Sequence, residues 1–454
     1  MTGLELKKSL EAGKTGKLFS KLYGEKEIGF QKKRYSALID GMLKNEPDWF
    51  PVSEFPEVTA ELRVFSAPGR TELGGNHTDH NHGKVLAASI QMDSAAVVAP
   101  RNDKKVFYRS TSYPDVIVDL TDTSPRNDER GTTEALIRGI AAEFEKRGRE
   151  IRGFTANADS TVLKGSGLSS SAAVEVSICK IFDCLCGDGK TGALELAQIG
   201  QKAENNYFGK PCGLMDQTAC ASGGAVAIDF ADTNKPFVKE INFDPAATGF
   251  FLCVVDTGGN HADLTPEYAS IPNEMKAAAS FFGKDTLREI DENSMIANFS
   301  KLREKAGDRA LLRAMHFFNE NRRVDAMLSS LKKINSSSGN AKNAAMDDFL
   351  SLVNSSGDSS WEILQNVYAP SSPEGQGLSL ALSLTKDFIK NHGVRGACRV
   401  HGGGFAGTIQ VYLPHEVFDL YRKLIESCFG KDALTLLRIR PEGALELKFY
   451  CKKL

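Results

Sequence analysis

A glycine- and serine-rich turn in the first half of the chain constrains the fold most strongly. The run Lys164-Gly165-Ser166-Gly167-Leu168-Ser169-Ser170-Ser171-Ala172-Ala173 follows a predicted strand and short loop at 151–162. After it, apolar residues recur at the spacing of one helix face, at Val174, Ile178, Ile181 and Leu185. The turn therefore opens into a helix N-terminus, whose unpaired N–H groups and positive dipole end attract anions. We interpret it as an anion site, for which phosphate is the usual ligand.

Two familiar nucleotide motifs do not fit this turn. It lacks the Gly-Lys-Ser/Thr of a Walker A loop at the required spacing. It also lacks the Gly-x-Gly-x-x-Gly fingerprint of dinucleotide-binding folds. A plain tight turn or helix cap is the structural alternative to a phosphate site.

Composition sets the broad class of protein. A chain of 454 residues favours two or three domains, and its contents of 41% hydrophobic and 25% charged residues are ordinary for soluble proteins. The net charge of -2 predicts no general attraction to nucleic acid or to an anionic membrane. Nine cysteines without a Cys-x-x-Cys pair indicate a reducing compartment. Since no apolar run reaches about 18 residues and the N-terminus is polar, we expect a cytoplasmic protein without a signal peptide.

A polar, glycine-rich loop is predicted at 67–83, between two strands. It holds three histidines within six residues, but no Cys or Glu stands at a standard zinc-site spacing. A zinc site made by these histidines is one alternative, and a surface loop without a role is another. Arg70, His77 and Asp79 argue against it, because together they supply the charge and hydrogen bonding that suit a polyhydroxylated ligand.

A second polar turn follows the helix predicted at 191–208. Glu204 lies on the flank of the apolar face of that helix, and a Pro- and Gly-containing turn then leads to Asp216. Most aspartates in such places are helix caps or solvated loop residues, so Asp216 alone is a weak catalytic candidate.

The second half of the chain is expected to form its own domain. A continuous apolar run at 250–255 predicts a buried strand near its start. Helices are expected over 273–331, and a flexible Ser-, Asn- and Gly-rich region around a short helix over 335–360. The order that follows, with helix, two strands, helix and two strands (the last pair near 434–440 and 444–451), suits an α+β sandwich. The predicted units are a helical arm at 1–58, an N-terminal domain at 59–246 and a C-terminal domain at 247–454.

Three separated stretches, 69–83, 164–173 and 401–407, resemble the motifs of the GHMP kinases, the small-molecule kinases that include galactokinase and mevalonate kinase. Gly69-Arg70 with His77-Thr78-Asp79, and the stretch 203–217 with its Pro-Cys-Gly-Leu-Met-Asp-Gln, resemble the galactokinase branch in particular. The resemblance covers about residues 60–454, with the motifs in order. It implies a two-domain α+β GHMP kinase-like fold: a mixed-sheet N-terminal domain and a ferredoxin-like C-terminal sandwich, with the active site between them.

The resemblance also implies a role for each motif residue. Asp216 would be the catalytic aspartate facing the anomeric hydroxyl of a sugar, with Arg70 beside it and near the transferring phosphate. The nucleotide phosphates of ATP would be held by Lys164, Gly165, Ser166, Gly167, Leu168, Ser169, Ser170 and Ser171. Mg²⁺ would be bound by Ser171 and Glu204. The sugar would be contacted by Asn76, His77, Asp79, Gly213 and Tyr268, the last from the stretch His261-x-x-Leu-x-x-Glu-Tyr. Gly402–Gly407 would close over the phosphate loop.

This assignment agrees with the chemistry of phosphoryl transfer. The reaction needs an in-line hydroxyl, a metal on the phosphates and positive charge where negative charge develops. Asp216 could accept the hydroxyl proton while Arg70 keeps it ionised, either as a base or as an electrostatic positioner. Mg²⁺ prefers oxygen ligands and retains waters, so one hydroxyl and one carboxylate are a reasonable protein share.

The sugar-recognition motif departs from the family pattern. Galactokinases usually carry Asn-Leu-Ile-Gly-Glu-His-Thr-Asp-Tyr, whereas this chain has Glu-Leu-Gly-Gly-Asn-His-Thr-Asp-His at 72–80. Asn76 therefore stands where the family has a sugar-binding glutamate, and His80 stands where it has tyrosine. The arginine cluster usual after Tyr268 is replaced by Ala-Ser-Ile-Pro-Asn at 269–273.

The predicted function is ATP-dependent phosphorylation of the C1 hydroxyl of a monosaccharide, with galactose, converted to galactose 1-phosphate, as the leading substrate. A kinase for N-acetylgalactosamine or arabinose is one alternative, and a catalytically silent sugar and ATP sensor is another. The expected partners are small molecules rather than nucleic acid or membrane, and the choice between monomer and homodimer stays open.

Overall fold

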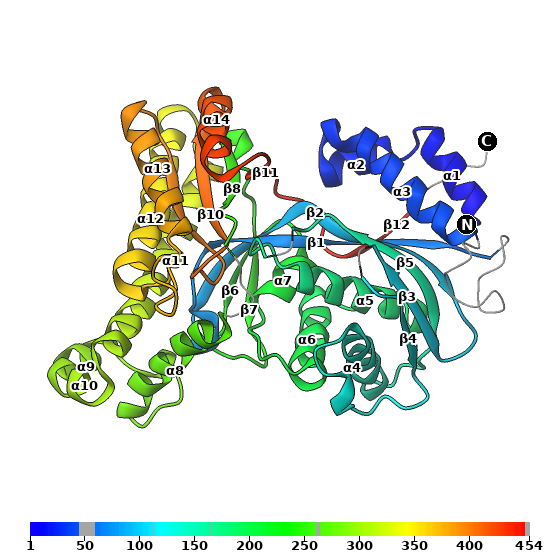
Figure 1. Cartoon of the computed structure of the whole chain (residues 1–454), viewed down its shortest axis with the longest axis horizontal. Coiled ribbons are helices and arrows are strands. Elements are labelled where there is room, and N and C mark those ends of the chain that lie inside the picture. The colour runs from blue at the N-terminus through cyan, green and yellow to red at the C-terminus, as the bar shows by residue number, and fades with distance from the viewer. Residues whose placement is uncertain (45–59, 112, 164, 260–263, 450–454) are drawn as a thin grey trace.

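The computed structural model describes residues 1–44, 60–111, 113–163, 165–259 and 264–449. Two β-sheets lie side by side, each covered by helices, and the three N-terminal helices pack on one face of the first sheet (Figure 1). Lys164 and His261 of the predicted site stretches lie outside the described residues.

The first sheet has eight strands in the described part of the chain. Their order is β12-β1-β2-β5-β3-β4, with β6 paired to β2 and β7 to β6, and all neighbours are antiparallel except β3 and β5. The strands are β1 (Arg63–Gly74), β2 (Lys84–Pro100), β3 (Lys105–Ser110), β4 (Val116–Asp119), β5 (Phe154–Ser160), β6 (Ala225–Asp229), β7 (Phe237–Ile241) and β12 (Leu445–Leu447). This mixed sheet confirms the predicted architecture of the first half.

Helices cover both faces of this sheet (Figure 1). On one face lie α4 (Thr133–Lys146), α5 (Ser170–Cys186), α6 (Ala193–Ala203), a π-helical turn (Glu204–Phe208) and α7 (Met215–Ser222). On the other face lie α1 (Gly3–Glu11), α2 (Gly16–Tyr23) and α3 (Ile28–Leu43), so the described part of the predicted arm, residues 1–44, is largely helical. Every residue of β1 after Arg63 is buried, because the strand is packed from both sides.

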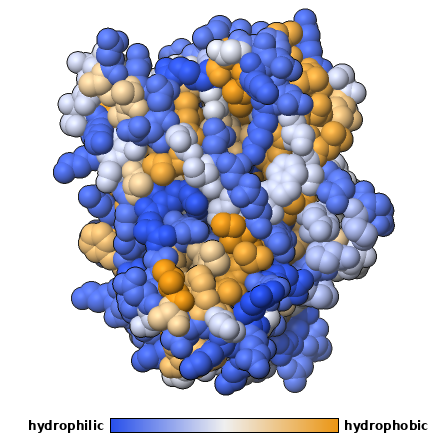
Figure 2. Space-filling view, turned by 90° about the vertical axis from the view of Figure 1, so that its left-hand side faces the viewer, coloured by the Kyte–Doolittle hydropathy of each residue, from blue (hydrophilic) through white to orange (hydrophobic). Residues whose placement is uncertain are grey.

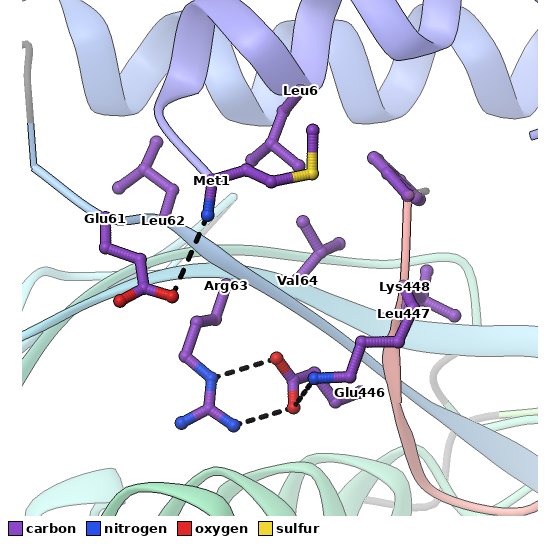
Figure 3. A pocket seen from close by; sticks show the side chains of 10 residues that line it. Met1, Leu6, Glu61, Leu62, Arg63, Val64, Glu446, Leu447 and Lys448 are labelled. Carbon is purple, nitrogen blue, oxygen red and sulfur yellow. Dashed lines mark hydrogen bonds and ion pairs between the residues drawn. The ribbon is translucent and has the colours of Figure 1, made fainter. Parts of the chain in front are cut away.

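Polar contacts anchor the N-terminal helices and the sheet edge. Tyr23 and Arg34 both reach the buried carboxylate of Asp93 on β2, at 2.7 and 2.5 Å. At the edge where β12 joins β1, the guanidinium of Arg63 donates hydrogen bonds to both carboxylate oxygens of Glu446 (Figure 3). A bidentate pair of this kind fixes the relative position of two strands more firmly than a single contact does.

The second sheet is antiparallel, with the order β11-β8-β10-β9 over the residues that the structure describes. Its strands are β8 (Phe250–Asp256), β9 (Ala397–His401), β10 (Thr408–Pro414) and β11 (Leu434–Leu437). With α13 (Gly377–Asn391) before β9 and α14 (Phe418–Phe429) before β11, this is the βαββαβ order of a ferredoxin-like sandwich, as predicted.

A helical region is inserted after β8. It consists of α8 (Thr265–Phe281), α9 (Glu292–Ala297), α10 (Phe299–Ala306), α11 (Asp308–Ser336) and α12 (Gly339–Ser359), followed by a π-helical turn at Ser360–Leu364. The prediction of a flexible loop region at 335–360 is wrong. Met346, Phe349, Leu350 and Val353 recur on one face of α12 and are buried in the same core as Met327 of α11, so packing outweighs the weak helix propensity of Ser, Asn and Gly.

Two strand predictions also need correction. The predicted loop at 67–83 begins only after Gly74, because β1 continues along β2 through residue 74 with two register shifts. The segment near 444–451, expected to complete the second sheet, instead supplies β12 to the first. The predicted domain boundary at residue 247 stays a prediction. Near its C-terminal end the chain returns to the first sheet, where it forms β12.

The surface is mixed in character. Figure 2 views the side on which the inserted helices and α13 lie and shows polar residues over much of that face, with hydrophobic ones gathered below its middle and toward its upper right. No helix within the described ranges is long and apolar enough to cross a membrane.

Candidate active site

Asp216 and Arg70 form the centre of the site. Asp216 lies in the first turn of α7, and its Oδ1 accepts a hydrogen bond from Nε of Arg70 at 2.7 Å. Its Oδ2 accepts from the hydroxyl of Ser169. Burial opposes the charge of Arg70, but the neighbouring Asp216 outweighs it and raises the pKa of Arg70 further. Since the Asp216 side chain is 34% exposed, the site presents an oriented carboxylate to incoming ligands.

The predicted phosphate loop lies against this pair. The backbone N–H of Arg70 donates to the carbonyl of Leu168 at 3.0 Å, and its guanidinium donates to the carbonyl of Gly167. Gly167 and Ser169 both have positive φ, which turns the chain sharply into α5. The N-cap residue Ser169 does not cap the start of α5 with its side chain, which instead bonds Asp216, so this helix end can offer its first N–H groups to an anion.

A cavity beside Asp216 brings five of the predicted residues together. It is lined by Asp79, Ser171, Glu204, Lys210, Cys212, Gly213, Asp216 and Gln217. Asp79 and Gly213 form one wall, where a Cβ added to Gly213 would lie 1.9 Å from Oδ2 of Asp79. A larger residue at this position would displace the Asp79 carboxylate, so glycine lets the two sides of the wall come this close.

Glu204 also lines the cavity, and neighbouring side chains orient its carboxylate. It begins the π-helical turn after α6, a backbone irregularity that often occurs at functional sites. The amide of Gln217 donates to Glu204 and to Glu175 at 3.0 Å each, and so separates the two carboxylates. Lys210 lies 3.3 Å from the other oxygen of Glu204.

Glu175 is a buried acid that the sequence reasoning missed. It lies one turn after Ser171 on α5, and its Oε1 has no hydrogen-bond partner in the described part of the chain. Burial first, and then the nearby Glu204, raise the pKa of Glu175 to about 8. Its spacing of four residues from Ser171 on one helix face was the available signal, but its partner Gln217 comes from another helix.

The donor set of Ser171 and Glu204 fits Mg²⁺. A hydroxyl and a carboxylate that line one cavity offer the oxygen ligands that this ion prefers, and they leave positions for phosphate oxygens and water. The histidines of the 75–83 loop offer no comparable set. Within the described ranges, no group of three or more His, Cys, Asp or Glu side chains is arranged to hold a metal ion.

The glycine-rich loop at 402–407 contacts the 75–83 loop, α8 and the phosphate loop. Nε2 of His77 donates to the carbonyl of Gly403 at 2.8 Å, and the hydroxyl of Tyr268 donates to that of Gly404 at 3.0 Å. Burial, and then neighbouring His80, lower the pKa of His77 to about 3, so its ring is neutral. A Cβ on Gly402 would lie 3.3 Å from Cα of Gly167, so this loop lies in contact with the phosphate loop.

Comparisons with known proteins identify the family. The galactokinase galactose-binding signature matches residues 53–100, and the GHMP kinases N terminal domain matches residues 135–224. A galactokinase from Streptomyces coelicolor is 32% identical over 381 residues, which are 83% of this chain and 91% of the relative. The chain belongs to the galactokinase family.

Further relatives agree with this membership. A galactokinase from Glaesserella parasuis is 30% identical over 82% of this chain and 90% of its own length. The crystal structure of Lactococcus lactis galactokinase complexed with galactose superposes with a TM-score of 0.69 at 25% identity, over 85% of this chain and 95% of that one. A mevalonate kinase structure, at 16% identity and a TM-score of 0.56, shares the fold. The GHMP kinase fold and kinase activity predicted from the motifs are thereby confirmed, with ATP as a substrate.

Asn76 occupies an unexpected setting for a family sugar ligand. Its Nδ2 donates to the carbonyl of Gly402 at 2.7 Å and to the carboxylate of Glu72 at 3.1 Å. Its Oδ1 accepts from Asn366 at 3.1 Å, and the side chain is buried outside the cavity lining. Glu72 in turn forms a buried ion pair with Arg399. The predicted sugar contact of Asn76 stays a prediction, and the structure uses its amide to join the 75–83 loop to the glycine-rich loop.

Proposed function

We propose that this member of the galactokinase family transfers the γ-phosphoryl group of ATP to the C1 hydroxyl of galactose, giving galactose 1-phosphate and ADP. The observation that carries the proposal is the Arg70–Asp216 pair: Arg70 contacts the phosphate loop, and Asp216 lines one cavity with Asp79 and Gly213. This arrangement would bring a phosphate site and a polar sugar site to the same carboxylate. The galactokinase relatives and the galactose-bound structure support galactose as the substrate.

Asp216 would receive or attract the proton of the attacking hydroxyl. Its Oδ1 and Oδ2 are oriented by Arg70 and by Ser169, so little reorganisation is needed when a sugar arrives. Arg70 also lies against the phosphate loop, where its charge can offset the negative charge that develops on the transferring group.

The phosphate loop and the cavity walls would hold the nucleotide. The N–H groups at the start of α5 suit the phosphates of ATP. Lys164 would also contact these phosphates, an assignment that rests on its position in the motif alone. Ser171 and Glu204 would bind Mg²⁺, which neutralises phosphate charge when it is present. Gln217, which lines the same cavity, donates to Glu204 and so orients its carboxylate.

The sugar would lie on the side of Asp79 and Gly213. Asp79 is a partly buried acceptor whose pKa is lowered: burial opposes ionisation, but the hydrogen bond and charge of His80 outweigh it. His77 of the 75–83 loop and Tyr268 of α8 each donate a hydrogen bond to the glycine-rich loop and would complete the ring of sugar contacts.

Product analysis tests this function. The protein is incubated with ATP, Mg²⁺ and galactose, and the product is examined by ³¹P and ¹³C NMR. The proposal requires a phosphomonoester whose phosphorus couples to C1 of the sugar. Phosphate on another carbon, or no sugar phosphate at all, would overturn it.

A further inference from the structure

We infer that His316 and Glu320 of α11 are positioning residues that fix the backbone of the sugar-binding loop, residues 75–79, and thereby set the affinity for the sugar. The inference rests on the proposed function, because that function places the sugar beside this loop. Neither residue lines the cavity, and both lie in the inserted helical region more than 230 residues from the loop in sequence, as the separations of 240 and 245 show.

Glu320 holds the start of the loop. Its side chain is completely buried, and its Oε1 accepts the backbone N–H of Gly75 at 3.1 Å and the hydroxyl of Ser356 at 2.7 Å. An ion pair with Arg323, one turn further along α11, engages the other oxygen. The carboxylate therefore joins α11, α12 and the loop at a single point.

His316 holds the next peptide of the loop. Its Nε2 lies 2.9 Å from the carbonyl oxygen of Asn76, and its Nδ1 lies 2.9 Å from the hydroxyl of Ser359. A carbonyl oxygen only accepts, so Nε2 must carry the proton and Nδ1 must accept from Ser359. The ring is fully buried, and its burial favours this neutral form.

The loop needs such external support because its backbone is strained. Gly75 has a φ of 92°, and His77, which is not glycine, has a φ of 57°. A side chain other than glycine keeps such a conformation only where the surrounding structure imposes it. The two contacts from α11 act on Gly75 and Asn76, immediately before His77. They therefore aim the His77 ring at Gly403 and carry Asp79 to the wall that it forms with Gly213.

The turns of α11 that follow these two polar groups are packed by apolar side chains. Val324, Met327 and Leu331 bury the following turns of the same helix against apolar neighbours. Polar side chains at 316 and 320 find their partners in loop backbone and in hydroxyls of α12. Their chemistry thus serves the loop, in addition to the fold.

Two substitutions of His316 separate positioning from packing. His316→Gln can place a donor near the position of Nε2, whereas His316→Asn reaches only the position of Nδ1 and leaves the Asn76 carbonyl without a donor. Leu331→Ala, a buried truncation on the same helix away from the loop, is the control for general destabilisation. All three variants are compared with the unchanged protein for the KM of galactose, the KM of ATP, thermal stability and amide hydrogen exchange of a peptide spanning 73–83.

We expect His316→Asn to raise the KM of galactose roughly tenfold, as the loss of one buried hydrogen bond would, and to change the KM of ATP less than about twofold. Exchange in the 73–83 peptide should accelerate, and His316→Gln should recover most of both effects. Equal increases in both KM values, a galactose KM increase of the same size in Leu331→Ala, or unchanged exchange in the loop would each overturn the inference. If the unchanged protein gave no galactose-dependent ADP release, the proposed function would fail, while the exchange measurement would still decide the positioning role.

Discussion

Replacing Asn76 with glutamate should destabilise the protein in a pH-dependent way, although the family pattern has glutamate at this position. The amide of Asn76 donates to the Glu72 carboxylate at 3.1 Å, and both side chains are buried. A carboxylate placed there would face Glu72 directly and would lose the hydrogen bond to Gly402.

The magnitude follows from two estimates that agree. Two unit charges about 4 Å apart repel by about 4 kcal/mol at an effective dielectric constant of about 20. The pair can avoid this by sharing a proton, and holding a carboxyl of ordinary pKa about 4.3 protonated at about pH 7.5 also costs about 4 kcal/mol. Burial already raises the pKa of Glu72, with Arg399 and Arg70 opposing, so the shared proton is the expected outcome.

The sign of the pH dependence follows from this raised pKa. In the folded variant the carboxyl pair binds a proton that the unfolded chain releases at neutral pH, so stability increases as pH falls. The deficit of Asn76→Glu relative to Asn76→Gln, which matches its size without the charge, should be about 4 kcal/mol at pH 7.5 and about 2 kcal/mol at about pH 5.5.

Urea unfolding at the two pH values measures this deficit. The double variant Glu72→Asn/Asn76→Glu restores one carboxylate and one amide beside Arg399, and it should recover most of the stability without the pH dependence. A single variant as stable as Asn76→Gln at pH 7.5, a deficit that does not change with pH, or a double variant that recovers nothing would each refute this reasoning.

Three further substitutions test the active site. Asp216→Asn should leave the protein folded but lower kcat for ADP release by roughly 10²–10⁴-fold, and near-normal turnover would exclude Asp216 from the chemistry. Gly213→Ala should raise the KM of galactose at least about tenfold while the KM of ATP stays unchanged, because its Cβ would lie 1.9 Å from Asp79. Gln217→Met removes the donor that orients Glu204, so a titration of activity with Mg²⁺ should show a higher half-maximal concentration; an unchanged titration would contradict the proposed metal site.

The sequence predicted those parts of the site that short-range patterns specify. The turn into α5 depends on glycines and serines, and the turn before Asp216 on proline and glycine, each within about ten positions; the structure brings both turns to one cavity. The ferredoxin-like order of the second sheet was likewise readable from the succession of strands and helices.

The remainder depends on partners that are distant in sequence. The motif predicts that Asn76 contacts the sugar, yet its side chain hydrogen-bonds to Gly402 and Asn366, which lie 326 and 290 positions away in the sequence. The pairing of β12 with β1 and the burial of α12 are similarly set by the assembled core rather than by local propensity. No spacing rule within the 72–80 motif could have shown that Glu72 takes the carboxylate role beside Arg399.

The most direct test of the central claim is a coupled ADP-release assay with the unchanged protein, ATP and Mg²⁺ across a panel of sugars. The panel contains galactose, N-acetylgalactosamine and arabinose, with a reaction lacking sugar as the blank. The account predicts sugar-dependent ADP release with the highest kcat/KM for galactose. A higher kcat/KM for either of the other sugars, or ADP release no greater than the blank for all three, would contradict it.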